Sequence, residues 1–403
     1  DTTYKQQEQI IYNARDMAIA RCSFENATVA LVSATPSMES LFNAKEQRYY
    51  HLNLPKRIGI AGLPSIETID MRNEKMENDT WISPSLKSSI SKTLEKKEQV
   101  LLFINRRGYA PLTLCKSCGE KIECRKCDSY LVYHKVKNNL ICHQCGYKEI
   151  FKNKCKSCDQ NNSYIQYGPG IERLLEETKM CFPDSIVKSI SSDNSDDFMK
   201  TMDELVLGEI DIIIGTQIIS KGYHLPNLTL VGIIDADLGL ISSDLRASEY
   251  TFQLLQQVSG RSGRDKKKGK ALIQTYYPHN PVIDALINND RDKFVEAELK
   301  MREQSNLPPY GRLATITISD TNEKSLMKFG SYLFSKIPIS SAVEVLGPAP
   351  APILKIRNRY RYKFLIKASK KVSIQKFIEN WIEDIKKPRT IRLLIDIDPY
   401  NFL

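Results

Sequence analysis

The chain has 403 residues, of which 41% are hydrophobic and 26% charged, a balance typical of a folded protein with two or three domains. No apolar run approaches the roughly 18–20 residues of a membrane-spanning helix, and no signal peptide opens the chain, so no membrane partner is expected. The 58 Lys and Arg residues against 48 Asp and Glu give a net charge of +10. This surplus favours a polyanionic partner, most often nucleic acid, although a generally lysine-rich composition would produce it too.

Residues 1–56 are predicted to contain a helix followed by a buried strand. Apolar side chains recur at helical spacing in the first part, at Ile10, Ile11, Ala14, Met17 and Ala18. The apolar run at 28–36, TVALVSATP, indicates a buried strand that ends in a turn at Pro36. Residues 57–81 combine proline, glycine, asparagine and charged residues without periodicity, which indicates a linker.

Helices and strands alternate over residues 82–300, the second predicted domain. The expected helices span 84–97, 170–181, 195–207 and 247–259. The expected strands span 100–104, 186–190, 210–215, 228–235 and 270–275. Strands separated by helices form a parallel sheet covered on both faces. An α/β domain is therefore expected, interrupted by a cysteine-rich insertion at residues 113–160.

A third domain is predicted at residues 306–403. Its expected elements are, in order, a strand, a helix, two strands, a helix and a strand, at 313–318, 323–335, 343–346, 360–366, 373–385 and 391–396. The order βαββαβ is that of a small α+β sandwich.

Eight of the ten cysteines form four C-x-x-C pairs, Cys115/Cys118, Cys124/Cys127, Cys142/Cys145 and Cys155/Cys158. Two thiols in one tight turn suit tetrahedral Zn²⁺, so eight ligands predict two structural sites of four cysteines each. A disulfide framework would need an oxidising compartment, which nothing in the sequence indicates. Cys22 and Cys181 are expected to be ordinary buried thiols.

The pairing of the cysteines is predicted to be nested. The residues between Cys127 and Cys142 alternate and turn at Asn138-Asn139, which is typical of a hairpin whose ends meet. Cys124, Cys127, Cys142 and Cys145 should then bind one zinc, and Cys115, Cys118, Cys155 and Cys158 the other.

Basic residues alternate strictly in KIRNRYRYK, at Lys355, Arg357, Arg359, Arg361 and Lys363. On one strand all five would point to one face, where they would follow a DNA backbone. The alternative is charge that protects an edge strand from aggregation.

Three further segments carry polar groups at the ends of predicted elements. Ser33 and Thr35 stand in the turn SATP, which taken alone is a common strand end. GTQIISKGYHLP at 215–226 offers Thr216, Gln217, Ser220, Lys221 and Gly222 to phosphates, or forms a polar loop. In QQVSGRSGR, Arg261 and Arg264 follow a helix and suit one anion, or complement the helix dipole.

Taken in order, the segments SATP, FINRRGYAP, GTQIISKG and QVSGRSGR resemble motifs III, IV, V and VI of superfamily 2 helicases. Three further features narrow this resemblance to one helicase family. They are the eight-cysteine insertion, the opening YKQQEQIIYNARDMAIAR and the closing IDIDPYNF. The whole chain resembles the C-terminal part of the PriA family of replication-restart DNA helicases. The resemblance implies a RecA-like helicase lobe 2 with an inserted zinc region, the tail of lobe 1 at 1–56, and the C-terminal α+β domain.

The resemblance also implies roles by position. Ser33 and Thr35 would couple nucleotide state to DNA binding. Motif V would supply Thr216, Gln217, Lys221 and Gly222 at the nucleotide site and lobe interface. Motif VI would supply Gln257, Arg261 and Arg264, and its arginines would reach the γ-phosphate. Tyr4, Lys5 and Tyr12 fall in an aromatic-rich loop that senses single-stranded DNA, in agreement with the stacking ability of tyrosine, or the tyrosines simply pack.

One part of the family pattern is missing. The chain contains neither a Walker A loop nor the acidic D-E-E-H box that binds Mg²⁺, and residue 1 is not Met. We therefore expect a piece of a longer protein that is inactive alone and needs its N-terminal half to bind ATP and Mg²⁺.

The resemblance implies an ATP-dependent 3′→5′ DNA helicase that recognises stalled forks and initiates primosome assembly. Its partners would be forked and single-stranded DNA, primosome proteins and single-stranded DNA-binding protein, in the cytoplasm with the nucleoid. The alternative from another class is a non-catalytic zinc-containing module for nucleic-acid binding or assembly. A RecQ-like helicase fits less well, because that class carries one zinc after lobe 2.

Overall fold

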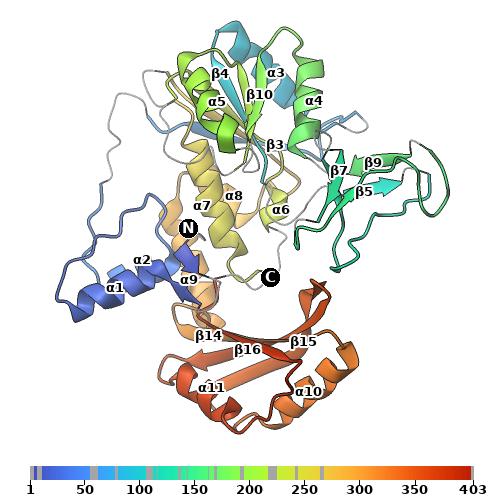
Figure 1. The fold of residues 1–403 in the computed structure, drawn as a ribbon. Coiled ribbons are helices and arrows are strands. Elements are labelled where there is room, and N and C mark those ends of the chain that lie inside the picture. Colours follow the sequence, from blue (N-terminus) through green and yellow to red (C-terminus); the bar gives the residue numbers. More distant parts are fainter. Residues whose placement is uncertain are drawn as a thin grey trace. The chain divides into compact units, whose positions relative to one another are not determined.

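The computed structural model describes residues 4–6, 11–54, 62–77, 80–105, 112–115, 117–134, 138–142, 144–161, 163–167, 170–190, 195–216, 225–240, 244–263 and 267–400. Figure 1 shows its ribbon. The chain divides into two compact units: unit 1 comprises Asp1–Asn43, Leu112–Gln166 and Ala297–Leu403, and unit 2 comprises Ala44–Pro111 and Tyr167–Glu296. In the described part of the chain, no helix is long and apolar enough to cross a membrane.

Unit 2 is built on a six-stranded sheet with the order β10-β11-β4-β12-β13-β3, in which all neighbours are parallel. The strands are β3 Ser65–Asp70, β4 Gln99–Phe103, β10 Val187–Ile190, β11 Ile212–Gly215, β12 Leu228–Ile233 and β13 Lys270–Thr275. Strands β4, β11 and β12 are buried along their whole length, as their continuous apolar runs require in a covered parallel sheet. The predicted parallel α/β sheet is confirmed.

Four helices lie at or within two residues of the predicted places: α3 Pro84–Glu95, α4 Ile171–Cys181, α5 Ser195–Leu207 and α7 Ala247–Ser259. Three more were not predicted: α6 Asp237–Leu240, α8 Pro281–Ile287 and α9 Arg291–Gln304, which contains the boundary between the units. Helix α3 shows why the sequence starts a helix there, because the Ser83 hydroxyl accepts from the Leu86 amide and Pro84 occupies the first turn. Its Leu86 and Ile90 pack with Val100 and Leu102 in one core cluster.

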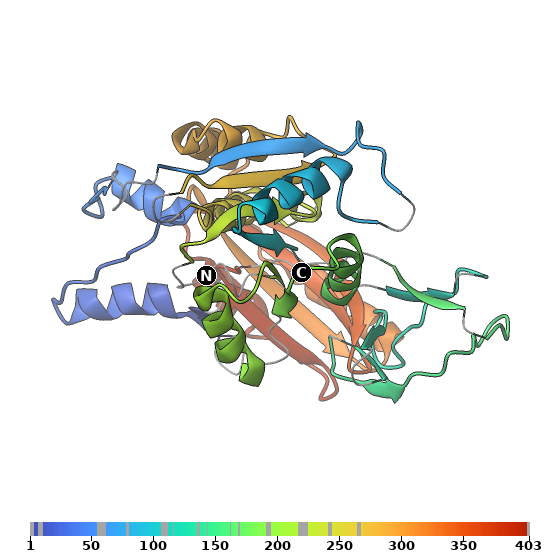
Figure 2. The same cartoon turned by 90° about the horizontal axis from the view of Figure 1, so that it is seen from above.

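The predicted linker at 57–81 is wrong in its central part, because β3 lies within it. Strand β3 pairs in parallel with β13, from Ser65 opposite Lys270 to Asp70 opposite Thr275 (Figure 2). The strand forms the edge of the sheet and is mostly half-exposed. An edge strand needs few apolar residues, so the segment SIETID carries little hydrophobic signal.

The predicted buried strand at 28–36 is also wrong. Residues 28–33 adopt no regular structure, and their side chains are exposed, with Val32 94% exposed. A buried strand needs neighbours on both sides, and none of the described strands pairs with this segment. The segment is followed by α2 Met38–Lys45, whereas the first predicted helix appears as α1 Ala14–Phe24.

The C-terminal part of unit 1 is the predicted βαββαβ domain. Its elements are β14 Gly311–Asp320, α10 Glu323–Ser335, β15 Val343–Ile356, β16 Arg359–Ser369, α11 Ile374–Ile382 and β17 Arg392–Ile397. The sheet has the order β15-β16-β14-β17 and is antiparallel. Residues of both helices pack with the sheet in one core cluster, where the Phe364 and Trp381 rings meet edge to face with their centroids 5.4 Å apart.

Unit 1 also contains the cysteine-rich insertion and a short N-terminal ribbon. The insertion forms β5 Leu112–Cys115 paired with β9 Tyr164–Tyr167, and a three-stranded sheet of β6 Val132–His134, β7 Asn139–Ile141 and β8 Lys148–Ile150. The ribbon pairs β1 Lys5–Gln6 with β2 Tyr12–Asn13.

Candidate zinc centres and nucleic-acid interface

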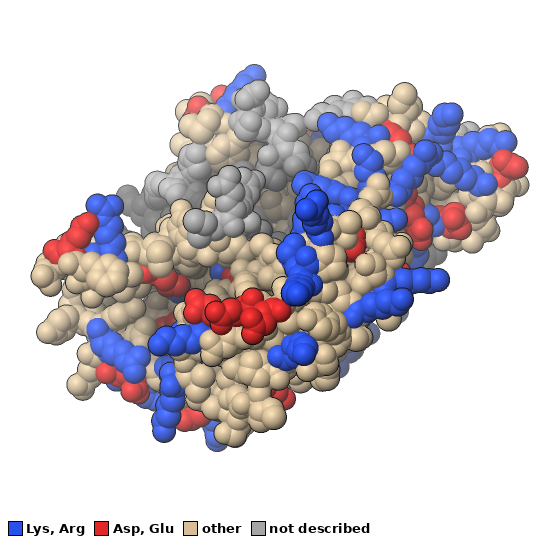
Figure 3. All heavy atoms as spheres, turned by 60° about the horizontal axis from the view of Figure 1, so that its bottom comes forward, with Lys and Arg blue, Asp and Glu red and all other residues tan. Residues whose placement is uncertain are grey.

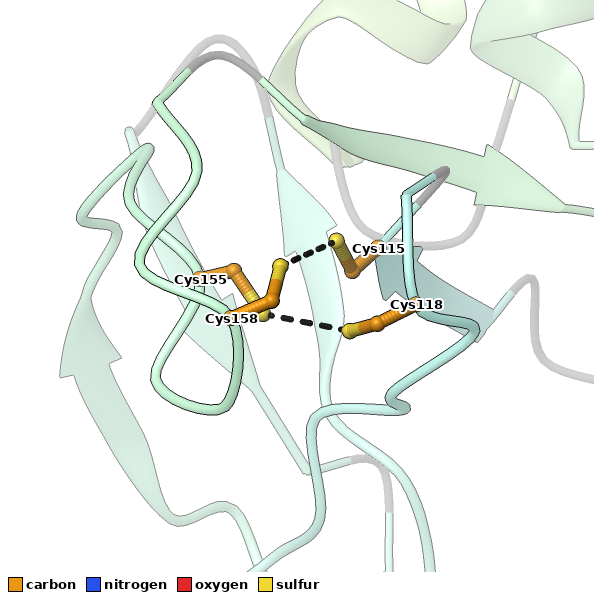
Figure 4. Close-up of side chains that lie close together, drawn as sticks. All are labelled: Cys115, Cys118, Cys155 and Cys158. Atoms are coloured by element: carbon orange, nitrogen blue, oxygen red, sulfur yellow. Dashed lines mark hydrogen bonds between the residues drawn. The ribbon is translucent and has the colours of Figure 1, made fainter.

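The outer cluster consists of Cys115, Cys118, Cys155 and Cys158 (Figure 4). The Sγ atoms of Cys115 and Cys158 lie 3.6 Å apart, and so do those of Cys118 and Cys155. Cys115 ends β5, and Cys155 and Cys158 stand in a turn before β9, so the pairing of β5 with β9 brings the two C-x-x-C segments together.

The inner cluster consists of Cys124, Cys127, Cys142 and Cys145. The Sγ atoms of Cys124 and Cys145 are 3.7 Å apart. The predicted hairpin brings them together, because β6 and β7 are antiparallel with Val132 opposite Ile141. The nested pairing is confirmed, and sequential pairing is excluded.

Both clusters fit Zn²⁺. Four sulfur atoms at about 2.3 Å from a tetrahedral zinc lie about 3.8 Å from one another, close to the observed 3.6 and 3.7 Å. A disulfide would bring two sulfurs to about 2.05 Å, and all ten cysteines are free. Four thiols fill each tetrahedron, so these are two structural zinc sites without an open position.

One thiol in each cluster has a pKa near neutrality. Cys115 Sγ and Ser163 Oγ form a hydrogen bond of 3.2 Å, and this contact together with nearby backbone amides lowers the pKa of Cys115 to about 6. Burial raises the pKa of Cys142, but the Ser129 hydroxyl and two amides outweigh it and bring the pKa to about 7. The thiolate is the form that binds zinc, and these hydrogen bonds favour it at one cysteine of each cluster. The sequence prediction missed both serines, although Ser129 stands two residues after a ligand.

The zinc region carries basic and aromatic side chains on its surface. Lys121 lies over the Tyr130 ring at 5.2 Å, and Lys126 lies over the Tyr147 ring at 5.5 Å. Basic side chains stacked on aromatic rings suit a polyanion. Figure 3 shows one face of the molecule, with Lys and Arg side chains scattered over it and an acidic patch near its middle.

The predicted stripe of five basic residues on one strand is wrong. Arg357 and Asn358, with φ of 50° and 61°, form the turn between β15 and β16. Lys355 pairs with Tyr360 across the hairpin and its Nζ lies 5.4 Å from the centre of that ring. Directly opposed residues of a hairpin share a face, so Lys355 lies on the face of Tyr360 and not on that of Arg359.

Three of the five, Arg359, Arg361 and Lys363, do alternate along β16, opposite the core-facing Tyr360 and Tyr362. Arg359 donates to the carbonyl oxygens of Ser319 at 2.7 Å and Thr390 at 2.6 Å, so it is tied to neighbouring backbone. Arg361 is half-buried, and burial lowers its pKa.

The N-terminal residues assigned to DNA differ in their surroundings. Tyr4 and Tyr12 are exposed at 55% and 42%. Lys5 is buried instead: its Nζ forms an ion pair with Asp396 at 2.7 Å and donates to the Asp398 carbonyl at 3.3 Å. The expectation that Lys5 meets a phosphate is therefore not supported, since this ammonium fastens the ribbon to β17.

The helicase-motif residues are only partly described. Ser33 and Thr35 lie together, with the Thr35 amide donating to Ser33 Oγ at 3.0 Å. Arg261 is buried just after α7, and Gln257 is exposed on that helix. Gln217, Ser220, Lys221, Gly222 and Arg264 lie outside the described residues.

Thr216 and the turn after Arg261 lie at opposite ends of the parallel strands. Thr216 follows the carboxyl end of β11. The turn after Arg261 reaches the amino end of β12, where the Gly263 amide donates to the Leu228 carbonyl at 2.9 Å. Among the remaining cysteines, Cys22 and Cys181 are half-exposed, not buried as expected.

Family models match three parts of the chain. They are the primosomal protein N C-terminal domain at residues 303–400, the PriA DNA helicase Cys-rich region domain at 124–149 and the helicase conserved C-terminal domain at 149–266. The last match assigns the parallel sheet to a helicase C-terminal lobe, as expected.

Relatives named replication restart protein PriA align over the whole chain. The protein of Rickettsia felis is 44% identical, that of Haemophilus influenzae 36% and that of Bacillus subtilis 34%. The chain spans 62%, 55% and 51% of these relatives, respectively. With the two cysteine clusters, the helicase lobe and the C-terminal domain all in the order that these matches require, the chain belongs to the PriA family of replication restart proteins.

Proposed function

We propose that the chain is the C-terminal part of an ATP-dependent 3′→5′ DNA helicase that recognises stalled replication forks and initiates primosome assembly. The observation that carries this proposal is the joining, in one chain, of a helicase C-terminal lobe, a region with two four-cysteine zinc sites and the C-terminal domain of primosomal protein N. Forked and single-stranded DNA, primosome proteins and single-stranded DNA-binding protein are its proposed partners, and the nucleoid its place in the cell.

In this proposal unit 2 supplies half of an ATP site. Arg261 and Arg264, with Gln257, act on the γ-phosphate, because arginine stabilises the charge of a transferring phosphoryl group. Lys221 and Gly222 contact the nucleotide, and Ser33 and Thr35 couple its state to DNA. Thr216 follows the carboxyl end of β11, whereas the Arg261 turn lies at the amino end of β12. Thr216 therefore serves the lobe interface and does not contact the γ-phosphate. The missing Walker A lysine and the Mg²⁺ carboxylates come from an N-terminal half.

The 403-residue chain by itself should show no DNA-stimulated ATP hydrolysis. Without a Walker A loop and the carboxylates that bind Mg²⁺, the phosphates are neither bound nor neutralised. The measurement is phosphate release with and without single-stranded DNA. Release above that of a mock preparation would contradict this expectation.

A joined protein, in which a relative supplies the N-terminal half, tests the helicase proposal. The segment that precedes the aligned region in the Rickettsia felis relative is fused to this chain, which is 44% identical to the rest of that relative. We expect DNA-stimulated ATP hydrolysis and 3′→5′ unwinding of a forked duplex. A folded fusion that binds DNA without hydrolysing ATP would favour the non-catalytic binding module instead.

Positive charge on β16 should contribute to DNA binding. Replacing Arg361 and Lys363 together by serine should weaken binding about equally for all sequences. It should also lower the slope of log K against log salt by about 0.7–0.9 for each phosphate that the variant no longer neutralises. Lys324 and Lys328, exposed on α10 across the same sheet, provide a serine double variant with the same charge change. Equal slopes for the two double variants would show that the β16 charges do not neutralise DNA phosphates.

A further inference from the structure

Three of the four C-x-x-C turns are closed by their own residues. In each, the residue after the second cysteine has a positive φ: 75° at Gly119, 74° at Gly146 and 56° at Asp159. Its amide donates to the carbonyl of the first cysteine, with distances of 2.8 Å for Gly119 to Cys115, 2.8 Å for Gly146 to Cys142 and 3.1 Å for Asp159 to Cys155. This left-handed residue is what turns the chain back over the thiols.

The next amide in each of these turns donates to the second thiol. The Tyr147 amide lies 3.4 Å from Cys145 Sγ. The amides of Glu120 and Gln160 bond in the same way to Cys118 and Cys158. Amide donors of this kind stabilise a thiolate, and so support the metal that it binds.

The turn at Cys124 and Cys127 departs from this pattern. The residue after its second cysteine is Asp128, which does not have a positive φ. The Asp128 amide donates to the Lys355 carbonyl at 2.8 Å instead of the Cys124 carbonyl. The amide donor to Cys127 Sγ is Arg357, at 3.4 Å, from a position 230 residues away in sequence.

The hairpin of β15 and β16 makes two more contacts with this turn. The Asn358 amide donates to the Lys126 carbonyl at 2.8 Å. Ile356 packs against the apolar cluster that contains Leu131, Leu140 and three of the inner ligands. The hairpin turn thus contributes two backbone donors, one backbone acceptor and one apolar side chain.

We propose that the inner zinc site is a two-part site, in which the C-terminal domain completes the Cys124–Cys127 turn through the amide of Arg357 and the side chain of Ile356. The hairpin supplies the hydrogen bond to the ligand that the other three turns make for themselves. Zinc binding and hairpin docking therefore stabilise each other, and by linkage each is weakened when the other is lost. The outer cluster, whose two turns are both self-closed, does not depend on the hairpin.

Zinc release from the 403-residue protein tests this coupling. A chromogenic chelator in excess reports the release of both zincs, expected as two phases. In Ile356→Ser, one phase should become about 10-fold faster or more, as for other residues that support metal ligands, while the other phase stays unchanged. Ile353→Ser is the matched control, since Ile353 is a half-exposed isoleucine of the same strand. Arg357→Gly keeps the backbone amide, and glycine suits the positive φ at this position. Like the control, it should release both zincs at the rates of the unaltered protein.

Two further measurements decide the question even where Ile356→Ser lowers stability. In Cys124→Ser, hydrogen exchange at the amides of residues 128, 357 and 358 should accelerate by about 10-fold or more while the β14 amides stay protected. Asp128→Gly should let the turn close on itself, so the double variant with Ile356→Ser should regain slow release. Unchanged release in Ile356→Ser, acceleration of both phases, or protection at 357 and 358 that survives loss of the inner zinc would each overturn the proposal.

Discussion

Replacing Cys142 by serine should remove one zinc per chain and unfold the β6–β7 hairpin. The side chain of Cys142 is fully buried, and three of the six buried members of its apolar cluster are themselves zinc ligands. A region of this size has too small an apolar core to fold without its metal, and a structural zinc contributes about 10–16 kcal/mol at neutral pH. Metal analysis should find one zinc in place of two, and hydrogen exchange should show loss of protection at 132–141.

The matched control for this experiment is Cys181→Ser. Cys181 is a half-exposed thiol at the end of α4, outside both clusters. This variant should retain two zincs and the exchange pattern of the unaltered protein. A Cys142→Ser protein that still contains two zincs would show that the inner site does not need four thiolates.

Replacing Arg261 by alanine in the joined protein should reduce the turnover of ATP about 1,000-fold or more and change the KM for ATP far less. An arginine that meets the γ-phosphate stabilises charge that develops in the transition state, so its loss falls on kcat. Initial rates over a range of ATP concentrations with saturating DNA measure both constants.

Arg261 is 7% exposed, so its removal can also disturb folding. Thermal unfolding of Arg261→Ala and Arg261→Lys separates the two effects, since lysine keeps the charge and most of the side-chain volume but not the planar fork. Lys268→Ala, an exposed cation in the chain segment that follows, should leave turnover unchanged. A turnover within about threefold of the unaltered protein in Arg261→Ala would remove Arg261 from the proposed role.

Most elements of the fold follow from local patterns. Helices α5, α7 and α10 have the predicted bounds, because apolar residues at helical spacing mark the buried side of each. The continuous apolar runs of β4 and β12 likewise identify covered parallel strands. The zinc pairing was also predictable, because the hairpin that joins Cys127 to Cys142 is a local structure with its own turn residue, Asn138, at a φ of 47°.

The two incorrect predictions of strands share one cause, which is that a strand depends on a partner strand distant in sequence. Strand β3 is defined by its pairing with β13 and not by its own polar sequence. The exposed apolar run at 28–33 has the composition of a strand but no described strand beside it. In both cases local composition pointed away from the structure, since pairing depends on the neighbour as much as on the segment.

The two zinc ligand sets, the parallel α/β lobe and the βαββαβ domain can be predicted from local patterns, because ligand spacing and apolar period are local properties of the chain. The roles of the charged residues depend instead on contacts between distant parts of the chain. Alternation in KIRNRYRYK fits one strand or a two-residue hairpin equally well, and the turn at Arg357 and Asn358 is fixed by contacts with the zinc region. Lys5 likewise meets Asp396 across 391 residues, an ion pair that exists only because folding brings the two ends of unit 1 together.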